Sequence, residues 1–82
     1  MTKLEKKLIE LGFTQGLIST YKWWKNYNDM VNFELLLKYN RIDYWDIERV
    51  FETNGNIVEL QQELNNLQKD LEILKGCEEN DK

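Results

Sequence analysis

The sequence has no histidine, no proline and a single cysteine, and these gaps exclude several kinds of site. Histidine is the commonest general base and a frequent metal ligand, so its absence removes the usual basis of acid–base catalysis. The one cysteine, Cys77, can form neither an intrachain disulfide nor a structural zinc site, and it fits a reducing compartment. The four glycines, at positions 12, 16, 55 and 76, form no phosphate-binding loop.

Long apolar runs are absent as well. The longest is 35–37, three leucines, whereas a membrane-spanning helix needs about 20 apolar residues. Residues 1–11 contain three lysines but lack the apolar stretch of a signal peptide. We therefore expect a cytoplasmic protein.

The 82 residues are 41% hydrophobic and 32% charged, which is too apolar for a wholly disordered chain. We expect one compact domain over residues 1–75 and a disordered acidic tail over 76–82. Charge is unevenly distributed, because residues 1–41 hold seven basic and four acidic residues and residues 42–82 hold four and eleven. This asymmetry either steers a charged partner or reflects a solvated acidic helix and tail.

The first half of the chain predicts a helix followed by a hairpin. Residues 3–11 have helical spacing of leucines, with Thr2 and Glu5 in a capping box and Gly12 at the end. Residues 17–25 are rich in β-branched and aromatic types, and residues 30–38 alternate apolar and polar side chains, so both predict strands.

The second half predicts a third strand and a long helix. Residues 42–53 fit a strand or a helix, and we favour the strand because three strands stabilise a sheet better than two. Residues 57–75 predict a helix, with Asn56 and Glu59 resembling a capping box and Gly76 at the end. The expected fold is α+β, in the order α-β-β-β-α, with the helices over one face of a three-stranded antiparallel sheet.

The C-terminal helix carries a heptad stripe of leucines. Such a stripe either forms the seam of a homodimeric coiled coil or packs against the chain's own sheet. The residues that we predict for self-association are Leu60, Leu64, Leu67, Leu71 and Leu74.

Catalysis is not expected. Acidic residues cluster at Asp43, Asp46, Glu48 and Glu52, but no pattern around them indicates a cleft that would desolvate them. We therefore predict no catalytic residue, no metal site and no cofactor.

The aromatic residues point to binding. Trp23 and Trp24 are adjacent, so in a strand they face opposite sides, and either one is exposed or each lies under a terminal helix. The segment 22–25, with a lysine at each end, also resembles a stacking platform for single-stranded nucleic acid. A pI near 4.8 argues against binding of single-stranded nucleic acid by this segment, because the positive field that such binding needs is missing.

A wider resemblance combines several of these segments. The opening 4–13, the strand pair rich in Trp and Tyr, and the Asn-Gly-Asn-Ile segment 54–57 before a leucine helix resemble small accessory proteins of phages and mobile elements of AT-rich Gram-positive bacteria. That class includes the anti-CRISPR proteins. The resemblance implies a non-catalytic inhibitor or modulator that binds a host enzyme in the cytoplasm of the host cell, with acids in the place of nucleic-acid phosphates.

We place the partner-binding surface on the sheet and the acidic segment that follows it. Aromatic anchors surrounded by charge are typical of protein-binding patches, and acids favour a partner with a basic groove. Tyr44 and Trp45 fit a buried core nearly as well. The predicted partner-binding residues are Trp24, Asp43, Tyr44, Trp45, Asp46 and Glu48.

Overall fold

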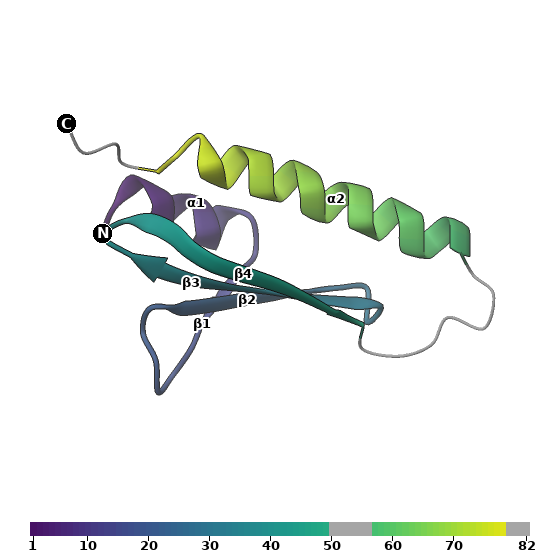
Figure 1. Ribbon diagram of the computed structural model, residues 1–82, viewed down its shortest axis with the longest axis horizontal. Coiled ribbons are helices and arrows are strands. Elements are labelled where there is room, and N and C mark those ends of the chain that lie inside the picture. The colour runs from purple at the N-terminus through teal and green to yellow at the C-terminus, as the bar shows by residue number, and fades with distance from the viewer. Residues whose placement is uncertain (50–56, 79–82) are drawn as a thin grey trace.

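The computed structural model describes residues 1–49 and 57–78 and has an α+β fold. The four strands form one antiparallel sheet in the order β1-β2-β3-β4, and both helices lie on the same side of it (Figure 1). The other side, called the open face from here on, has no helix over it within the described residues. In chain order the elements are α1 (Lys3–Glu10), β1 (Thr14–Gln15), β2 (Lys22–Tyr27), β3 (Val31–Lys38), β4 (Arg41–Arg49) and α2 (Ile57–Lys75).

Helix α1 begins as the sequence predicts. The Thr2 hydroxyl accepts a hydrogen bond from the Glu5 backbone N–H at 3.1 Å, and the Glu5 carboxylate accepts one from the Thr2 N–H at 2.9 Å. This capping box satisfies N–H groups that the start of a helix leaves unpaired. Leu4 and Leu8 are fully buried, and Gly12 follows the helix with φ of 93°, a conformation that favours glycine.

Tight turns join β2 to β3 and β3 to β4. Each turn contains two consecutive residues with positive φ, Asn28 and Asp29 in the first and Tyr39 and Asn40 in the second. Turns of this kind match the twist of a hairpin, and asparagine and aspartate tolerate them well. The Asn26 side chain also accepts a hydrogen bond from the Asp29 N–H at 2.7 Å. The predicted hairpin is present as β2 and β3, and β3 and β4 form a second one.

The sheet has four strands where the sequence predicts three. The predicted strand 17–25 is displaced, because residues 16–21 form a loop and the strand begins at Lys22. Local hydrogen bonds stabilise this loop, from the Gly16 N–H to the Lys22 carbonyl at 2.8 Å and from the Lys22 N–H to the Ser19 carbonyl at 3.0 Å. The additional strand is β1, only two residues long, which pairs with β2.

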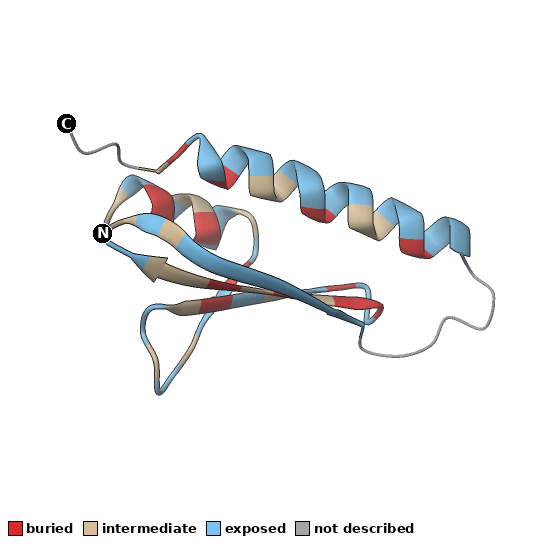
Figure 2. Cartoon of the chain, viewed as in Figure 1, coloured by how far each residue is buried: buried red, intermediate tan, exposed pale blue. Residues whose placement is uncertain are grey.

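The favoured strand in the segment 42–53 is confirmed for residues 42–49, which belong to β4, while residues 50–53 lie outside the described residues. Strand β4 pairs with β3 along its length, with a shift of register between Leu36 and Leu37. The sheet face under the helices is apolar because every second residue of β3, from Val31 to Leu35, is apolar and points toward the helices. Val31, Phe33 and Leu35 are fully buried (Figure 2).

Helix α2 covers the sheet with its leucine stripe and is tied to β2 by a polar cluster. Leu60, Leu67 and Leu74 are buried. Asp70 accepts hydrogen bonds from Lys25 Nζ at 2.8 Å and from the Tyr27 hydroxyl at 2.6 Å. These contacts fix the rotation of the helix, with the flank that contains Asp70 toward β2.

The packed part of the chain continues past Lys75, where the predicted tail would begin. Cys77 is buried in the core. The Glu78 carboxylate accepts a hydrogen bond from the backbone N–H of Ile42 at 2.6 Å, so the end of α2 is attached to the start of β4. The rest of the predicted tail, 79–82, lies outside the described residues.

Candidate protein-binding surface

The open face carries a regular grid of side chains that the antiparallel register sets. Trp24 lies opposite Glu34, and Glu34 lies opposite Asp46, so one row crosses β2, β3 and β4. Side chains two positions apart in a strand share a face, so the neighbouring rows follow from the same register. We call the following nine residues the open-face grid: Lys22, Leu36 and Tyr44; Trp24, Glu34 and Asp46; Asn26, Asn32 and Glu48.

The two adjacent tryptophans have different environments because β2 alternates. Trp23 is buried under the helices, whereas Trp24 points to the open face and is 38% exposed. Tyr44 is exposed in the neighbouring row, across β3 from Lys22. Of the alternatives left by the sequence, the structure has one tryptophan in the core and one available on the surface.

The loop 16–21 projects from the sheet on the side away from the helices (Figure 1). Leu17 and Ile18 at its tip are 98% and 100% exposed. Two adjacent large aliphatic side chains are here in contact with solvent over almost their whole surface. Exposed apolar patches tend to mark binding sites.

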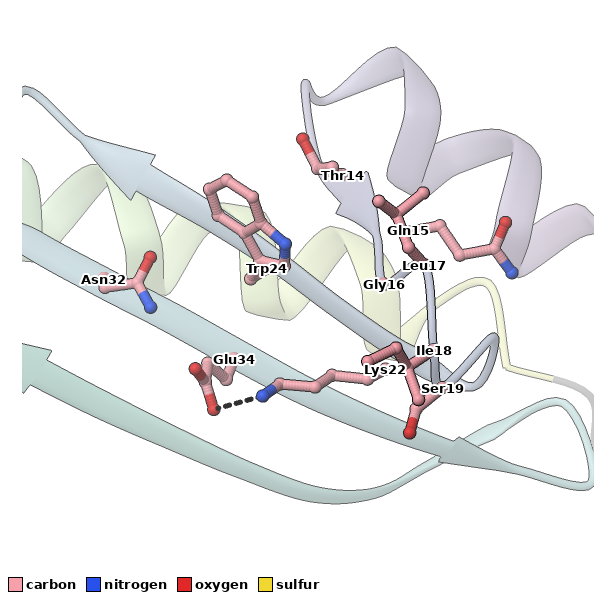
Figure 3. A pocket seen from close by; sticks show the side chains of 10 residues that line it. All are labelled: Thr14, Gln15, Gly16, Leu17, Ile18, Ser19, Lys22, Trp24, Asn32 and Glu34. Atoms are coloured by element: carbon pink, nitrogen blue, oxygen red, sulfur yellow. Dashed lines mark ion pairs between the residues drawn. The ribbon is translucent and has the colours of Figure 1, made fainter.

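The same loop and the open-face grid together enclose a shallow hollow of about 840 Å³ (Figure 3). Trp24, Leu17 and Ile18 supply its apolar lining, and Lys22 and Glu34 line it from the sheet. The hollow therefore combines an aromatic ring, two aliphatic side chains and charged groups within one small area.

A side chain at position 16 would force this loop to shift. A Cβ atom there would lie 2.8 Å from the Ser19 carbonyl oxygen, closer than van der Waals contact permits. The Gln15 side-chain amide also donates a hydrogen bond to the Thr20 carbonyl, across the base of the loop. Hydrogen bonds to backbone carbonyls at the base of the loop therefore hold the tip residues in place.

Negative charge dominates the open-face grid. Its charged members are the acids Glu34, Asp46 and Glu48 and the single base Lys22, whose Nζ lies 3.6 Å from Glu34 Oε1. Glu34 and Asp46 are direct cross-strand neighbours, and like charges in that arrangement are destabilising. A basic surface placed over this grid would relieve that repulsion.

The six predicted partner-binding residues do not share one surface. Trp24, Tyr44, Asp46 and Glu48 lie on the open face, but Trp45 turns to the helix side. There it meets Phe33 edge to face, with ring centroids 5.9 Å apart. Asp43 lies at the end of the β3–β4 hairpin, where it lines a small hollow with Lys38 and Arg41. Alternation along β4 and the shift of register near Leu36 cause this separation, which leaves four of the six predicted residues on the open-face grid.

The predicted self-association residues are already used within the monomer. Leu60, Leu67 and Leu74 are buried in the core, and Leu64 and Leu71 pack against it. A coiled-coil seam on this stripe would have to remove α2 from its own sheet. The structure therefore adopts the second of the two arrangements that the sequence allows for the leucine stripe.

The set of predicted partner-binding residues omits Leu17, Ile18 and Glu34. The first two were assigned to a strand on their β-propensity, although Gly16 immediately before them was a signal for a turn. Glu34 belongs to the surface only through cross-strand pairing with Trp24 and Asp46, which no local pattern reveals.

Residues 1–49 and 57–78 contain no group of three or more potential metal ligands placed to hold an ion. Neither α1 nor the described α2 has the length and apolar character needed to cross a membrane.

Comparison of the chain with known protein families, with characterised proteins and with solved structures found no match.

Proposed function

We propose that this protein is a non-catalytic binding module that inhibits or modulates a host enzyme. It docks its open face and the tip of loop 16–21 on a basic surface of that enzyme, such as a nucleic-acid-binding groove. The observation that carries the proposal is the pair Leu17 and Ile18, almost fully exposed beside Trp24 at the edge of an acidic grid.

Apolar anchors and acids have different roles in such a complex. Tryptophan, tyrosine and aliphatic side chains that become desolvated supply most of the affinity at an interface. Exposed acids contribute more to the rate of association and to the choice of partner. The hollow beside Trp24 suits an inserted side chain, and Asp46 and Glu48 suit basic residues around it.

The two rival functions receive less support. A coiled-coil adaptor needs a free leucine stripe, but Leu67 and its neighbours in the stripe belong to the core. A stacking platform for single-stranded nucleic acid needs several free rings and cations. Trp23 is buried, and the lysines on both sides of the tryptophans are paired, Lys22 with Glu34 and Lys25 with Asp70.

The identity of the partner class comes from the resemblance and from charge. The resemblance to accessory proteins of phages, the class that includes the anti-CRISPR proteins, implies a protein that blocks a host enzyme, with acids in the place of nucleic-acid phosphates. An acidic grid with apolar anchors is suited to that task, because an enzyme that binds nucleic acid offers a basic groove. We place the action of the protein in the host cytoplasm.

A comparative capture experiment tests the proposal. Tagged full-length protein is used as bait in lysate of an AT-rich Gram-positive bacterium, and captured proteins are identified by mass spectrometry. The double variant Leu17→Ser/Ile18→Ser removes the loop anchors. The matched control is Val58→Ser/Ile73→Ser, which changes two exposed aliphatic residues of α2 on the other side of the sheet.

We expect the wild type and the control to retain the same basic protein and the loop variant to lose it. Circular dichroism should show the same fold for all three, because Leu17 and Ile18 are almost fully exposed and the two control residues also lie on the surface, where substitutions change stability little. Equal capture by the loop variant would overturn the proposal, as would a captured partner whose enzymatic activity is unchanged by saturating amounts of the protein.

A further inference from the structure

Strand β4 is a long edge strand with an unpaired side. It spans Arg41–Arg49, pairs only with β3 in the described sheet, and is exposed at every position except Ile42, which is half-buried. An edge of this length presents alternate backbone N–H and C=O groups to any strand that approaches. The opposite edge is less accessible, since β1 and loop 16–21 lie beside β2.

Two backbone N–H groups of β4 donate to carboxylates rather than to a neighbouring strand. The Ile42 N–H donates to Glu78 Oε2 at 2.6 Å, and the Ile47 N–H donates to Asp46 Oδ1 at 2.9 Å. The carboxylates of half-buried Glu78 and exposed Asp46 here take the place of the carbonyls of a further strand. The Asp46 carboxylate is free to exchange this contact for a basic side chain, which would release the Ile47 N–H for strand pairing.

The helix side of β4 is incompletely covered. Trp45 is 41% and Ile47 37% exposed, although their cross-strand neighbours on β3, Leu35 and Phe33, are fully buried. Asp70 places one flank of α2 over β2, and the helical period turns the opposite flank toward β4. That flank includes Leu64 and Leu71, which are only partly buried.

The two faces of β4 therefore offer different chemistry to a strand laid beside them. On the helix side the strand would meet Trp45 and Ile47, and on the open face it would meet Tyr44, Asp46 and Glu48. Cross-strand neighbours stabilise a sheet when apolar meets apolar and acid meets base. The matching segment has apolar side chains alternating with lysine or arginine.

We infer that β4 accepts an extended segment of the partner protein as a fifth strand of the sheet, and that this segment alternates basic and apolar residues. The inference rests on the proposed function and specifies how the basic partner is bound. Backbone hydrogen bonds to β4 supply affinity, and the alternation supplies specificity, as in other cases of β-strand addition.

A second copy of the chain is a poorer occupant of the same edge. Antiparallel pairing of β4 with itself about its centre, at Asp46 or Ile47, brings Asp46 of one copy against Asp46 or Glu48 of the other. Like charges at such positions oppose pairing. Inward or edge charges are a common device against self-addition, and the same charges admit a basic strand.

The inference is tested with a short acetylated and amidated peptide of alternating lysine and valine, added to the full-length isotope-labelled protein. We expect NMR shifts and slowed amide hydrogen exchange over residues 44–49. Two control peptides keep the composition. One groups the lysines and valines in blocks, and the other is N-methylated at alternate residues so that it cannot pair. Both should bind on the order of tenfold more weakly or worse, through loss of backbone hydrogen bonds and of matched neighbours.

Variants of the protein sharpen the test. Asp46→Asn/Glu48→Gln should weaken binding of the alternating peptide, whereas Glu10→Gln/Glu72→Gln, with the same change in net charge on the two helices, should leave it unchanged. The inference is overturned if the blocked or methylated peptide binds as well as the alternating one. It is also overturned if the free protein dimerises with its β4 amides protected.

The outcome also separates this inference from the proposed function. The variant Leu17→Ser/Ile18→Ser should bind the alternating peptide like the wild type, because the loop lies at the far edge of the sheet. If no peptide binds while capture of the partner still depends on Leu17 and Ile18, strand addition is wrong and the binding surface stands. If the peptide binds while capture is indifferent to the loop, the proposed surface is wrong and the edge site stands.

Discussion

Strands β3 and β4 are neighbours in one sheet, yet eight of the nine residues of β4 are exposed and only one of the eight residues of β3 is. Both contain large apolar residues, including Phe33 and Leu35 in one and Trp45 and Ile47 in the other. The difference comes from position, because β3 has a strand on each side and lies under the helices, whereas β4 is an edge. Apolar residues on β3 therefore stabilise the fold, and those on β4 remain available for binding.

The largest expected effect compares the same kind of truncation on the two strands. Leu35→Ala removes a fully buried side chain and should lower the free energy of unfolding by about 2–5 kcal/mol. Ile47→Ala, on the same side of β4, should cost about 1 kcal/mol because more than a third of that side chain is already exposed. Urea unfolding followed by circular dichroism measures both, and equal losses would show that β4 is as well covered as β3.

The next effect concerns the bond that holds α2 over β2. Tyr27→Phe removes the hydrogen bond to Asp70 and should cost about 1.5–3 kcal/mol at neutral pH, as expected for a bond to a charged group. Burial, and then the hydrogen bond to Asp70, raise the pKa of Tyr27 well above its ordinary value of 10.0. The protonated tyrosine thus stabilises the fold fully below pH 10, and that contribution falls as the pH rises further, because only the unfolded chain loses the proton.

Unfolding curves between pH 8 and 11 check this dependence. Above pH 10, a difference of one bound proton between the folded and unfolded chain lowers the free energy of unfolding by about 1.36 kcal/mol per pH unit. The wild type should lose stability above pH 10 more steeply than Tyr27→Phe. Tyr39→Phe, at an exposed tyrosine in the β3–β4 turn, is the matched control and should keep the wild-type slope. Identical slopes for all three proteins would contradict the role of Tyr27.

A smaller effect is expected in the loop at the opposite edge from β4. Gly16→Ala would place a methyl group against the Ser19 carbonyl, and relief by movement of the loop should limit the cost to about 1 kcal/mol. Partner capture should decrease more than stability does, since the tip residues Leu17 and Ile18 move with the loop. A crystal structure or NMR shifts confined to residues 15–22 would confirm the displacement, and an unchanged loop would refute it.

The smallest effect has the opposite sign. Asp46→Asn removes the repulsion between Asp46 and Glu34 but retains an acceptor for the Ile47 N–H, so stability should rise by about 0.2–0.5 kcal/mol. The gain should shrink at high salt, because exposed charges are screened. It should also vanish in a Glu34→Gln background, and a gain that persists there would have another cause. Phe33 on β3 is fully buried, by contrast, so a polar substitution there should lower the free energy of unfolding.

Much of the fold was predictable from local patterns. The capping box at Thr2 and Glu5, the alternation of β3 and the leucine stripe of α2 each depend on residues close in sequence. The displaced β2 and the additional β1 were not predictable in this way, because the β-propensity of Leu17 and Ile18 was overridden by a loop that closes on Ser19 and Lys22. Pairing with Trp24, not intrinsic preference, makes Thr14 a strand residue.

The candidate surface was predictable only in part. Alternation correctly separates Trp23 from Trp24, and it separates Tyr44 from Trp45 in the same way. Register was the missing information. It places Glu34 between Trp24 and Asp46 and leaves Asp43 at the hairpin end beside Lys38 and Arg41. Register depends on turn geometry and on a shift near Leu36, and neither is a property of single strands.

By itself the sequence determined which segments are amphipathic, where α1 begins, and that the second half of the chain is acidic, because these depend on residue type and spacing along the chain. Tertiary structure alone decided that the leucine stripe serves the monomer's own core, that β4 is an exposed edge, and that Leu17 and Ile18 stand uncovered beside an acidic grid. Burial depends on what lies across from a side chain in space. An apolar residue in a central strand under a helix is core, and the same residue at an edge is a surface on which another protein can bind.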